Sequence, residues 1–169
     1  DAVITNNGLL SAVGVSGKCL HFDGTGDGLA IADHADLKFG TGDFSLSCWV
    51  KFDNIDATTE YLMCKRSGTD NGWILYRHAT NEKIYFTVDI GGVPDAASDS
   101  VVTAGSWYYL TGVRNGNTIY LYVNGILQSN IGDVTGGDSD NTADIFIGNA
   151  AGASAYLDCS LDEIRIYNR

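Results

Sequence analysis

The chain has 169 residues, a formal net charge of −11 and only 18% charged residues, which fits one domain spanning 1–169. This charge argues against nucleic acid and anionic membrane surfaces as partners, because both need a basic footprint on the protein. No run of about 18 apolar residues occurs, so we expect no membrane insertion. Its 21 glycines and nine tyrosines are typical of a β-protein with tight turns.

Short apolar runs separated by turn residues predict about a dozen strands. The run 44–52 alternates most clearly and places Phe44, Leu46, Cys48, Val50 and Phe52 on one face. Asn-Gly at 124–125 is the strongest hairpin signal, and no window has a helical period. The expected strands are 18–22, 29–31, 44–52, 61–65, 73–77, 83–88, 107–114, 118–123, 126–128, 144–148 and 161–167.

Antiparallel strands with alternating faces must bury one face against a second sheet. The pattern therefore predicts an all-β fold, as a two-sheet sandwich, a jelly roll or a closed barrel. Trp49 and Trp107 occupy positions that we expect in the core. The first residues lack the basic region of a signal peptide, and the last follow a strand-like run directly, as expected of a module from a longer protein.

Six short motifs follow one another along nearly the whole chain. They are 17–24 (GKCLHFDG), 43–50 (DFSLSCWV), 105–109 (GSWYY), 121–125 (LYVNG), 147–148 (IG) and 161–169 (LDEIRIYNR). Together they resemble the concanavalin A-like lectin/glucanase superfamily in its laminin G-like jelly-roll branch. The sequence departs from that pattern at Cys19 and Cys48, where small residues are usual, and at Asn124, where aspartate is common.

The resemblance implies two curved antiparallel sheets packed face to face, with the first and last strands adjacent. It also implies a domain that binds glycans or proteins, often with calcium. Such domains are modules of secreted enzymes, adhesins and phage structural proteins.

Acidic residues near the two end strands form a candidate calcium site. If these strands pair antiparallel, Asp23 and Asp27 approach Asp162 and Glu163. Calcium takes about six to eight oxygens from carboxylates and carbonyls, and the glycine-rich turn after Asp23 offers both. The alternative is that the aspartates cap turns and that Asp162 pairs with a cation such as Arg165.

Aromatic and arginine side chains are the candidate ligand contacts, because sugar rings stack on aromatic faces while polar groups fix their hydroxyls. The ligand is expected on the concave sheet or on rim loops 70–80, 89–100 and 132–143. The last of these contains 138–141 (DSDN), which mimics part of a calcium loop but lacks the glycine and distal glutamate of an EF-hand. The alternative is that the aromatic residues serve the core or the outer sheet face. The predicted contacts are Trp73, Tyr76, Arg77, Tyr85, Arg114, Tyr120 and Tyr122.

Catalysis is not expected. Glucanases of this fold use two carboxylates about 5–5.5 Å apart, which requires acids that alternate along one strand. The nearest acids, Asp162 and Glu163, are neighbours and point to opposite faces of a strand. No Gly-x-Ser-x-Gly motif occurs either.

The four cysteines form no CxxC pair, which argues against a zinc site. Cys48 and Cys64 lie equally far from Asp56, so a hairpin centred there would place them opposite each other at disulfide distance. The default expectation, however, is that all four cysteines are thiols acting as small buried hydrophobic side chains. A bridge would favour secretion, and thiols would favour folding in a reducing cytosol, as for virion proteins.

The sequence therefore predicts a non-catalytic, lectin-like carbohydrate-binding module with a structural calcium ion, within a larger extracellular enzyme or adhesin. The alternative is an attachment domain of a phage virion or cell-surface protein that binds a protein partner. Exposed aromatic residues around a groove would favour the first, and an apolar patch would favour the second.

Overall fold

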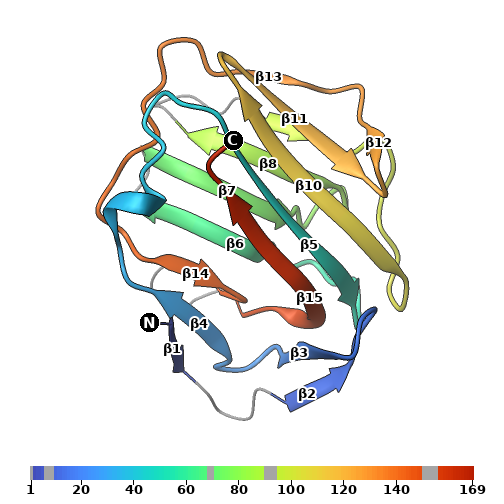
Figure 1. Ribbon diagram of the computed structural model, residues 1–169. Coiled ribbons are helices and arrows are strands. Elements are labelled where there is room, and N and C mark those ends of the chain that lie inside the picture. Colours follow the sequence, from blue (N-terminus) through green and yellow to red (C-terminus); the bar gives the residue numbers. More distant parts are fainter. Residues whose placement is uncertain (1, 6–9, 68–70, 90–94, 150–155) are drawn as a thin grey trace.

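The computed structural model describes residues 2–5, 10–67, 71–89, 95–149 and 156–169 (Figure 1). Strands make up nearly all of its regular structure, together with the 3-10 helix η1 (Ala35–Leu37). The strands are β1 (Ala2–Thr5), β2 (Leu10–Val13), β3 (Lys18–Asp23), β4 (Gly28–Ile31), β5 (Phe44–Phe52), β6 (Glu60–Ser67), β7 (Asn71–Arg77), β8 (Ile84–Asp89), β9 (Asp95–Ala97), β10 (Trp107–Asn115), β11 (Thr118–Val123), β12 (Ile126–Leu127), β13 (Gly132–Asp133), β14 (Ile145–Ile147) and β15 (Asp158–Tyr167).

The strands form two antiparallel sheets that pack face to face (Figure 1). The seven-stranded sheet has the order β1-β4-β14-β6-β7-β8-β9. The eight-stranded sheet has the order β12-β11-β10-β5-β15-β3-β2, and β13 pairs with β11 beside this path. The predicted all-β sandwich is therefore confirmed.

The core lies between the sheets and follows the alternation of the strands. On β5, the five residues predicted to share one face are all fully buried. They pack against apolar side chains of the other sheet, among them Leu62, Met63, Leu75 and Phe86. Full burial of a side chain of this size contributes about 1.5–3 kcal/mol, so this interface holds the layers together.

Strands β3 and β15, which carry the first and last of the six motifs, lie side by side, as predicted. Strand β15 runs between β5 and β3, and its pairing with β3 places Asp158 opposite Asp23 and Leu161 opposite Leu20. Strand β15 begins at Asp158, earlier than the 161 expected from the sequence. The Asn-Gly hairpin is also confirmed, because Asn124 and Gly125 adopt φ values of 53° and 78° between β11 and β12.

Four short strands were not predicted, namely β1, β2, β9 and β13, and neither was η1. No helix among the described residues is long and apolar enough to cross a membrane.

The three tryptophans lie where they were not expected: Trp73 is in the core, and Trp49 and Trp107 are outside it. Trp73 is 1% exposed and packs in the core against Phe44, with ring centroids 6.2 Å apart. Trp49 and Trp107 are only half-buried on the outward face of the eight-stranded sheet. Because Cys48 and Val50 of β5 point into the core, Trp49 between them must point out. The core assignment of Trp49 and Trp107 was therefore wrong.

All four cysteines are unbridged and buried. Cys48 lies on β5 of the eight-stranded sheet and Cys64 on β6 of the seven-stranded sheet, so the expected hairpin between them does not form. The candidate Cys48–Cys64 bridge, which the sequence left open, does not form, and the default expectation of small buried thiols is confirmed. Burial raises the pKa of the Cys48 thiol to about 12, so this group is not a reactive thiolate at neutral pH.

Candidate functional site

Three tyrosines cross the outward face of the seven-stranded sheet in one line. Tyr61 of β6 pairs with Tyr76 of β7, which pairs with Tyr85 of β8. Their rings stack, with centroids 5.9 Å and 5.4 Å apart. The His78 ring contacts both Tyr76 and Tyr85 at 6.4 Å and 5.7 Å. We call Tyr61, Tyr76 and Tyr85 the tyrosine row.

A β-bulge brings Tyr61 into this row. The pairing of β6 with β7 shifts between Tyr61 and Met63. Met63 opposes Leu75, and both are core residues. Simple alternation would place Tyr61 on the same inner face as Met63, whereas the extra residue at the bulge turns it outward.

A cavity of about 230 Å³ opens beside the tyrosine row, and we call it the tyrosine pocket. Its buried floor includes Ile74 and Thr87, which are paired across β7 and β8. The aromatic rings, the hydroxyl groups and the guanidinium of Arg66 therefore meet around this floor. The pocket is lined by Thr59, Tyr61, Arg66, Ile74, Tyr76, His78 and Thr87.

The polar groups of this site are fixed by hydrogen bonds and burial. Burial, together with the charge of Asp95, raises the pKa of Tyr76 to about 12, so its hydroxyl stays protonated and can donate. The Asn81 side-chain amide donates to the Tyr85 hydroxyl at 2.7 Å. The Thr80 hydroxyl lies 2.9 Å from Nδ1 of His78. These contacts orient the side chains before any ligand arrives, which lowers the entropic cost of binding.

Arg77 was predicted as a ligand contact, but it is fully buried. Its Nε donates to Glu60, and its terminal nitrogens donate to the carbonyl oxygens of Asp56 at 3.2 Å and Thr58 at 2.9 Å. Burial raises the pKa of Glu60, and the ion pair with Arg77 opposes this rise. Arg77 therefore stabilises the loop before β6 and is not available to a ligand.

Arg114 and Trp73 are corrected in the same way, because each is 1% exposed. The Arg114 guanidinium donates to three loop carbonyls, those of Gly40 at 2.9 Å, Gly116 at 3.1 Å and Gly137 at 2.6 Å. It therefore joins three loops at one end of the sandwich.

Tyr120 and Tyr122 lie on the outward face of the eight-stranded sheet, the side opposite the tyrosine row. Their half-buried rings share that face with Trp49 and Tyr109, whose centroids are 5.2 Å apart. The predicted ligand contacts are thus divided among two opposite faces and the core, and only Tyr76 and Tyr85 belong to the tyrosine row. Tyr61, Thr59 and His78 line the tyrosine pocket but were not predicted as ligand contacts.

The predicted calcium ligands are not brought together. Asp23 and Asp27 are close, since the Asp27 carboxylate accepts from the Asp23 amide at 3.4 Å. Asp162, however, lies four residues along β15 from Asp158, the partner of Asp23, which corresponds to roughly 13 Å. Asp162 accepts from the amides of Ser16 at 3.0 Å and Glu163 at 2.8 Å. Its role in the structure is to hold the turn before β3, and Arg165 pairs with Glu163 instead.

The second acidic loop also binds the protein's own backbone. The Asp140 carboxylate accepts from the Gly40 amide at 2.7 Å, and Asp138 accepts from the Asp140 amide at 2.9 Å. Within the described ranges, no group of three or more His, Cys, Asp or Glu side chains is arranged to hold a metal ion. Of the predicted ligand loops, residues 70 and 90–94 lie outside the described residues.

Comparisons with known proteins agree with this fold. The binding domain of Paraclostridial Mosquitocidal Protein 1 superposes with a TM-score of 0.80 at 15% identity, over 100% of this chain and 44% of that one. The receptor-binding domain of the botulinum neurotoxin C/D mosaic serotype gives 0.76 at 15% identity, over 100% and 43%. The chain thus spans less than half of either toxin domain.

Domain 4 of AbnA, a GH43 extracellular arabinanase from Geobacillus stearothermophilus, was solved in complex with arabinotriose. It gives a TM-score of 0.76 at 18% identity, over 98% of this chain and 81% of that one. No curated protein sequence matches the chain. A family model described as the concanavalin A-like lectin/glucanases superfamily matches residues 23–169. The chain therefore belongs to the concanavalin A-like lectin/glucanase superfamily.

Proposed function

We propose that the chain is a non-catalytic carbohydrate-binding module and that the tyrosine pocket is its sugar site. The observation that carries the proposal is the stacked tyrosine row beside a cavity lined by hydroxyls and a guanidinium. Sugars present apolar C–H faces and a rim of hydroxyls, and this pocket offers a partner for each.

The size of the pocket defines the ligand further. At about 230 Å³ it is smaller than the roughly 300–1,000 Å³ of sites for drug-sized ligands. One sugar ring would therefore enter, and neighbouring rings of a longer glycan would lie along Tyr76 and Tyr85. The pocket lining contains no carboxylate, so the proposed binding depends neither on a metal ion nor on a catalytic acid.

Relatives of the same fold support this class of function. AbnA domain 4 was crystallised with arabinotriose, and the toxin domains are binding domains. All three come from toxins or an extracellular enzyme, which supports a role as a binding module of a larger extracellular protein. The unbridged cysteines are compatible with that location, because buried thiols with raised pKa values, such as Cys48 and Cys159, resist oxidation.

A glycan array followed by calorimetry on the best glycan tests the proposal. Tyr61→Ala and Tyr85→Ala should each weaken binding about tenfold, because each removes a ring worth about 0.5–1.5 kcal/mol beyond its buried area. Tyr120→Ala is the matched control, since this half-buried tyrosine lies on the opposite sheet. The proposal fails if no glycan binds, or if Tyr120→Ala weakens binding while the other two variants do not.

A further inference from the structure

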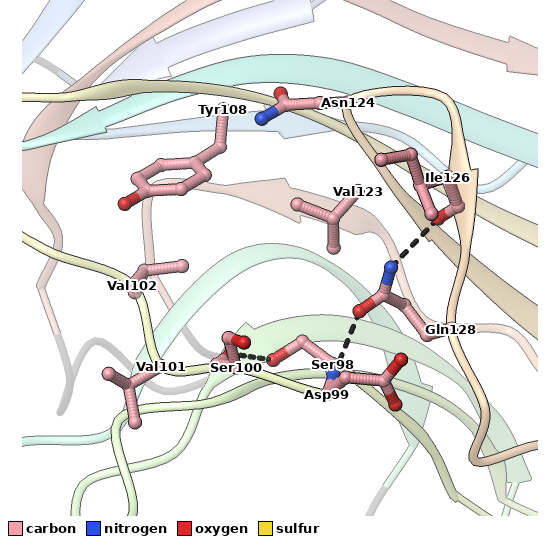
Figure 2. A pocket seen from close by; sticks show the side chains of 10 residues that line it. All are labelled: Ser98, Asp99, Ser100, Val101, Val102, Tyr108, Val123, Asn124, Ile126 and Gln128. Carbon is pink, nitrogen blue, oxygen red and sulfur yellow. Dashed lines mark hydrogen bonds between the residues drawn. The ribbon is translucent and has the colours of Figure 1, made fainter.

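A second cavity, which we call the edge pocket, opens at one lateral edge of the sandwich (Figure 2). Strand β9 ends the seven-stranded sheet and β12 ends the eight-stranded sheet, and a bridge between Ala97 and Asn130 holds these edges together. The cavity measures about 300 Å³. It is lined by Ser98, Asp99, Ser100, Val101, Val102, Tyr108, Val123, Asn124, Ile126 and Gln128.

Four of the ten side chains that line the edge pocket are aliphatic, namely those of Val101, Val102, Val123 and Ile126. Figure 2 shows the side chains of Tyr108, Val102 and Val123 around one side of the hollow. At its mouth, Val101 and Ile126 are 49% and 68% exposed. Among the described residues six large hydrophobic side chains are exposed, and two of them, Val101 and Ile126, line this cavity. Exposed aliphatic side chains gathered at a cavity mark an interaction surface.

Three polar side chains of the edge pocket, those of Gln128, Ser98 and Tyr108, have partners within the protein. The Gln128 side-chain oxygen accepts from the Asp99 amide at 2.8 Å, and its nitrogen donates to the Ile126 carbonyl at 2.8 Å (Figure 2). The Ser98 hydroxyl donates to the Ser100 carbonyl at 2.7 Å, and the Tyr108 hydroxyl accepts from the Thr103 amide at 3.1 Å. These bonds occupy the side chains of Gln128, Ser98 and Tyr108 before any ligand arrives.

One charged side chain, Asp99, stands in the lining. One of its oxygens accepts from the amide and the hydroxyl of Ser129, and these bonds lower the pKa of the carboxyl, so it is ionised at neutral pH. The charge of Lys83 also lowers this pKa. The second carboxylate oxygen can therefore face a cation of a partner.

We propose that the edge pocket docks a segment of a partner protein that inserts an aliphatic side chain beside a lysine or arginine facing Asp99. The four aliphatic side chains fit such an anchor, and the bonded side chains of Gln128, Ser98 and Tyr108 do not compete for it. A sugar fits less well, because these three side chains would have to exchange bonds within the protein for bonds to its hydroxyls. A second copy of this chain fits less well because each copy carries a net charge of −11 and the two would repel.

Methyl-detected NMR of the isotope-labelled chain tests this docking. The probe is N-acetyl-Lys-Ile-Lys-amide, and the control peptide carries glycine in place of isoleucine. We expect the methyl signals of Val101, Val102, Val123 and Ile126 to shift saturably at millimolar concentration, the range for a ligand with so few buried atoms. The glycine peptide should bind about tenfold more weakly or not at all, since it lacks the anchor.

Two neighbouring substitutions separate the pocket from the surrounding surface. Ile126→Ser should weaken binding of the isoleucine peptide about tenfold, whereas Leu127→Ser should leave it unchanged. Both side chains are exposed on β12, but only Ile126 lines the cavity. Asp99→Asn should weaken binding and reduce its dependence on salt. If Ile126→Ser disturbs the fold, Val101→Ser can replace it, because Val101 also lies at the mouth of the pocket and is 49% exposed.

Three results would overturn the proposal. The first is no saturable shift up to about 20 mM of the isoleucine peptide, a range that covers weak fragments. The second is an equal effect of Leu127→Ser and Ile126→Ser. The third is that arabinose or glucose shifts these methyl signals at lower concentration than the peptide, which would make the edge pocket a sugar site.

Discussion

Replacing Arg77 with methionine tests whether this side chain serves the fold or a ligand. The guanidinium is fully buried, pairs with Glu60 and donates to the carbonyl oxygens of Asp56 and Thr58. Methionine keeps much of the aliphatic volume but leaves the buried Glu60 carboxylate without its cation. Removing one partner of a buried ion pair costs about 3–5 kcal/mol, a large part of the roughly 5–15 kcal/mol that stabilises a domain.

The cost of Arg77→Met should depend on pH. Burial already raises the pKa of Glu60 in the native chain, and loss of the arginine removes the charge that opposes this rise. A carboxyl whose folded pKa lies above its unfolded value binds more protons in the folded state, so stability increases as the pH falls through the folded pKa. We therefore expect the deficit to be largest near about pH 7.5 and smaller near about pH 5. Adding Glu60→Gln should remove this dependence.

Urea unfolding followed by tryptophan fluorescence measures the free energy, and calorimetry on the folded variant measures glycan affinity. Arg165→Met is the control, because this arginine is 54% exposed and pairs with Glu163 at the surface. Such a pair contributes about 0–1 kcal/mol. Native stability of Arg77→Met would refute the structural role. Native stability combined with lost glycan binding would restore Arg77 as a ligand contact.

Three shorter tests concern the thiols, a glycine and the metal. The four buried cysteines should react with Ellman's reagent only when urea unfolds the chain, and labelling of the native chain would contradict their burial. Gly148→Ala should cost about 1–3 kcal/mol in urea unfolding, because its φ is 84° and a Cβ there would overlap the Phe22 ring. Gly116→Ala, with a φ of 58° and nothing within 4 Å, should cost less, and an equal loss would refute the steric argument. EDTA should leave glycan affinity unchanged in calorimetry, because the tyrosine pocket contains no carboxylate, and lost binding would place a metal at the site.

The long strands could be predicted because their two faces meet different environments. Strands β5 and β11 alternate between core and outward positions, and that alternation is visible in the sequence. The missed strands have no such period. Strand β9 begins with Asp95, and β13 consists of Gly132 and Asp133, residues that favour turns, so only their tertiary neighbours make them strands.

The site could be predicted only in part, because its geometry depends on register. Trp73, Tyr76 and Arg77 could not all contact one ligand, since alternation along β7 puts Trp73 and Arg77 on the face opposite Tyr76. That signal was present in the sequence. Tyr61, by contrast, reaches the tyrosine row only through the bulge in β6, and no local pattern reveals the bulge.

The two proposed binding surfaces use different physical properties of the same sandwich. The tyrosine pocket lies on the outward face of a sheet, where rings on three neighbouring strands are held by backbone pairing. The edge pocket lies where the sheets end, and its four aliphatic side chains are β-branched, with little rotamer freedom to lose on binding. The two pockets share no lining residue, although Tyr85 and Ala97 pair across the β8–β9 ladder that separates them. Because the two pockets share no lining residue, we expect a glycan and a protein segment to bind independently.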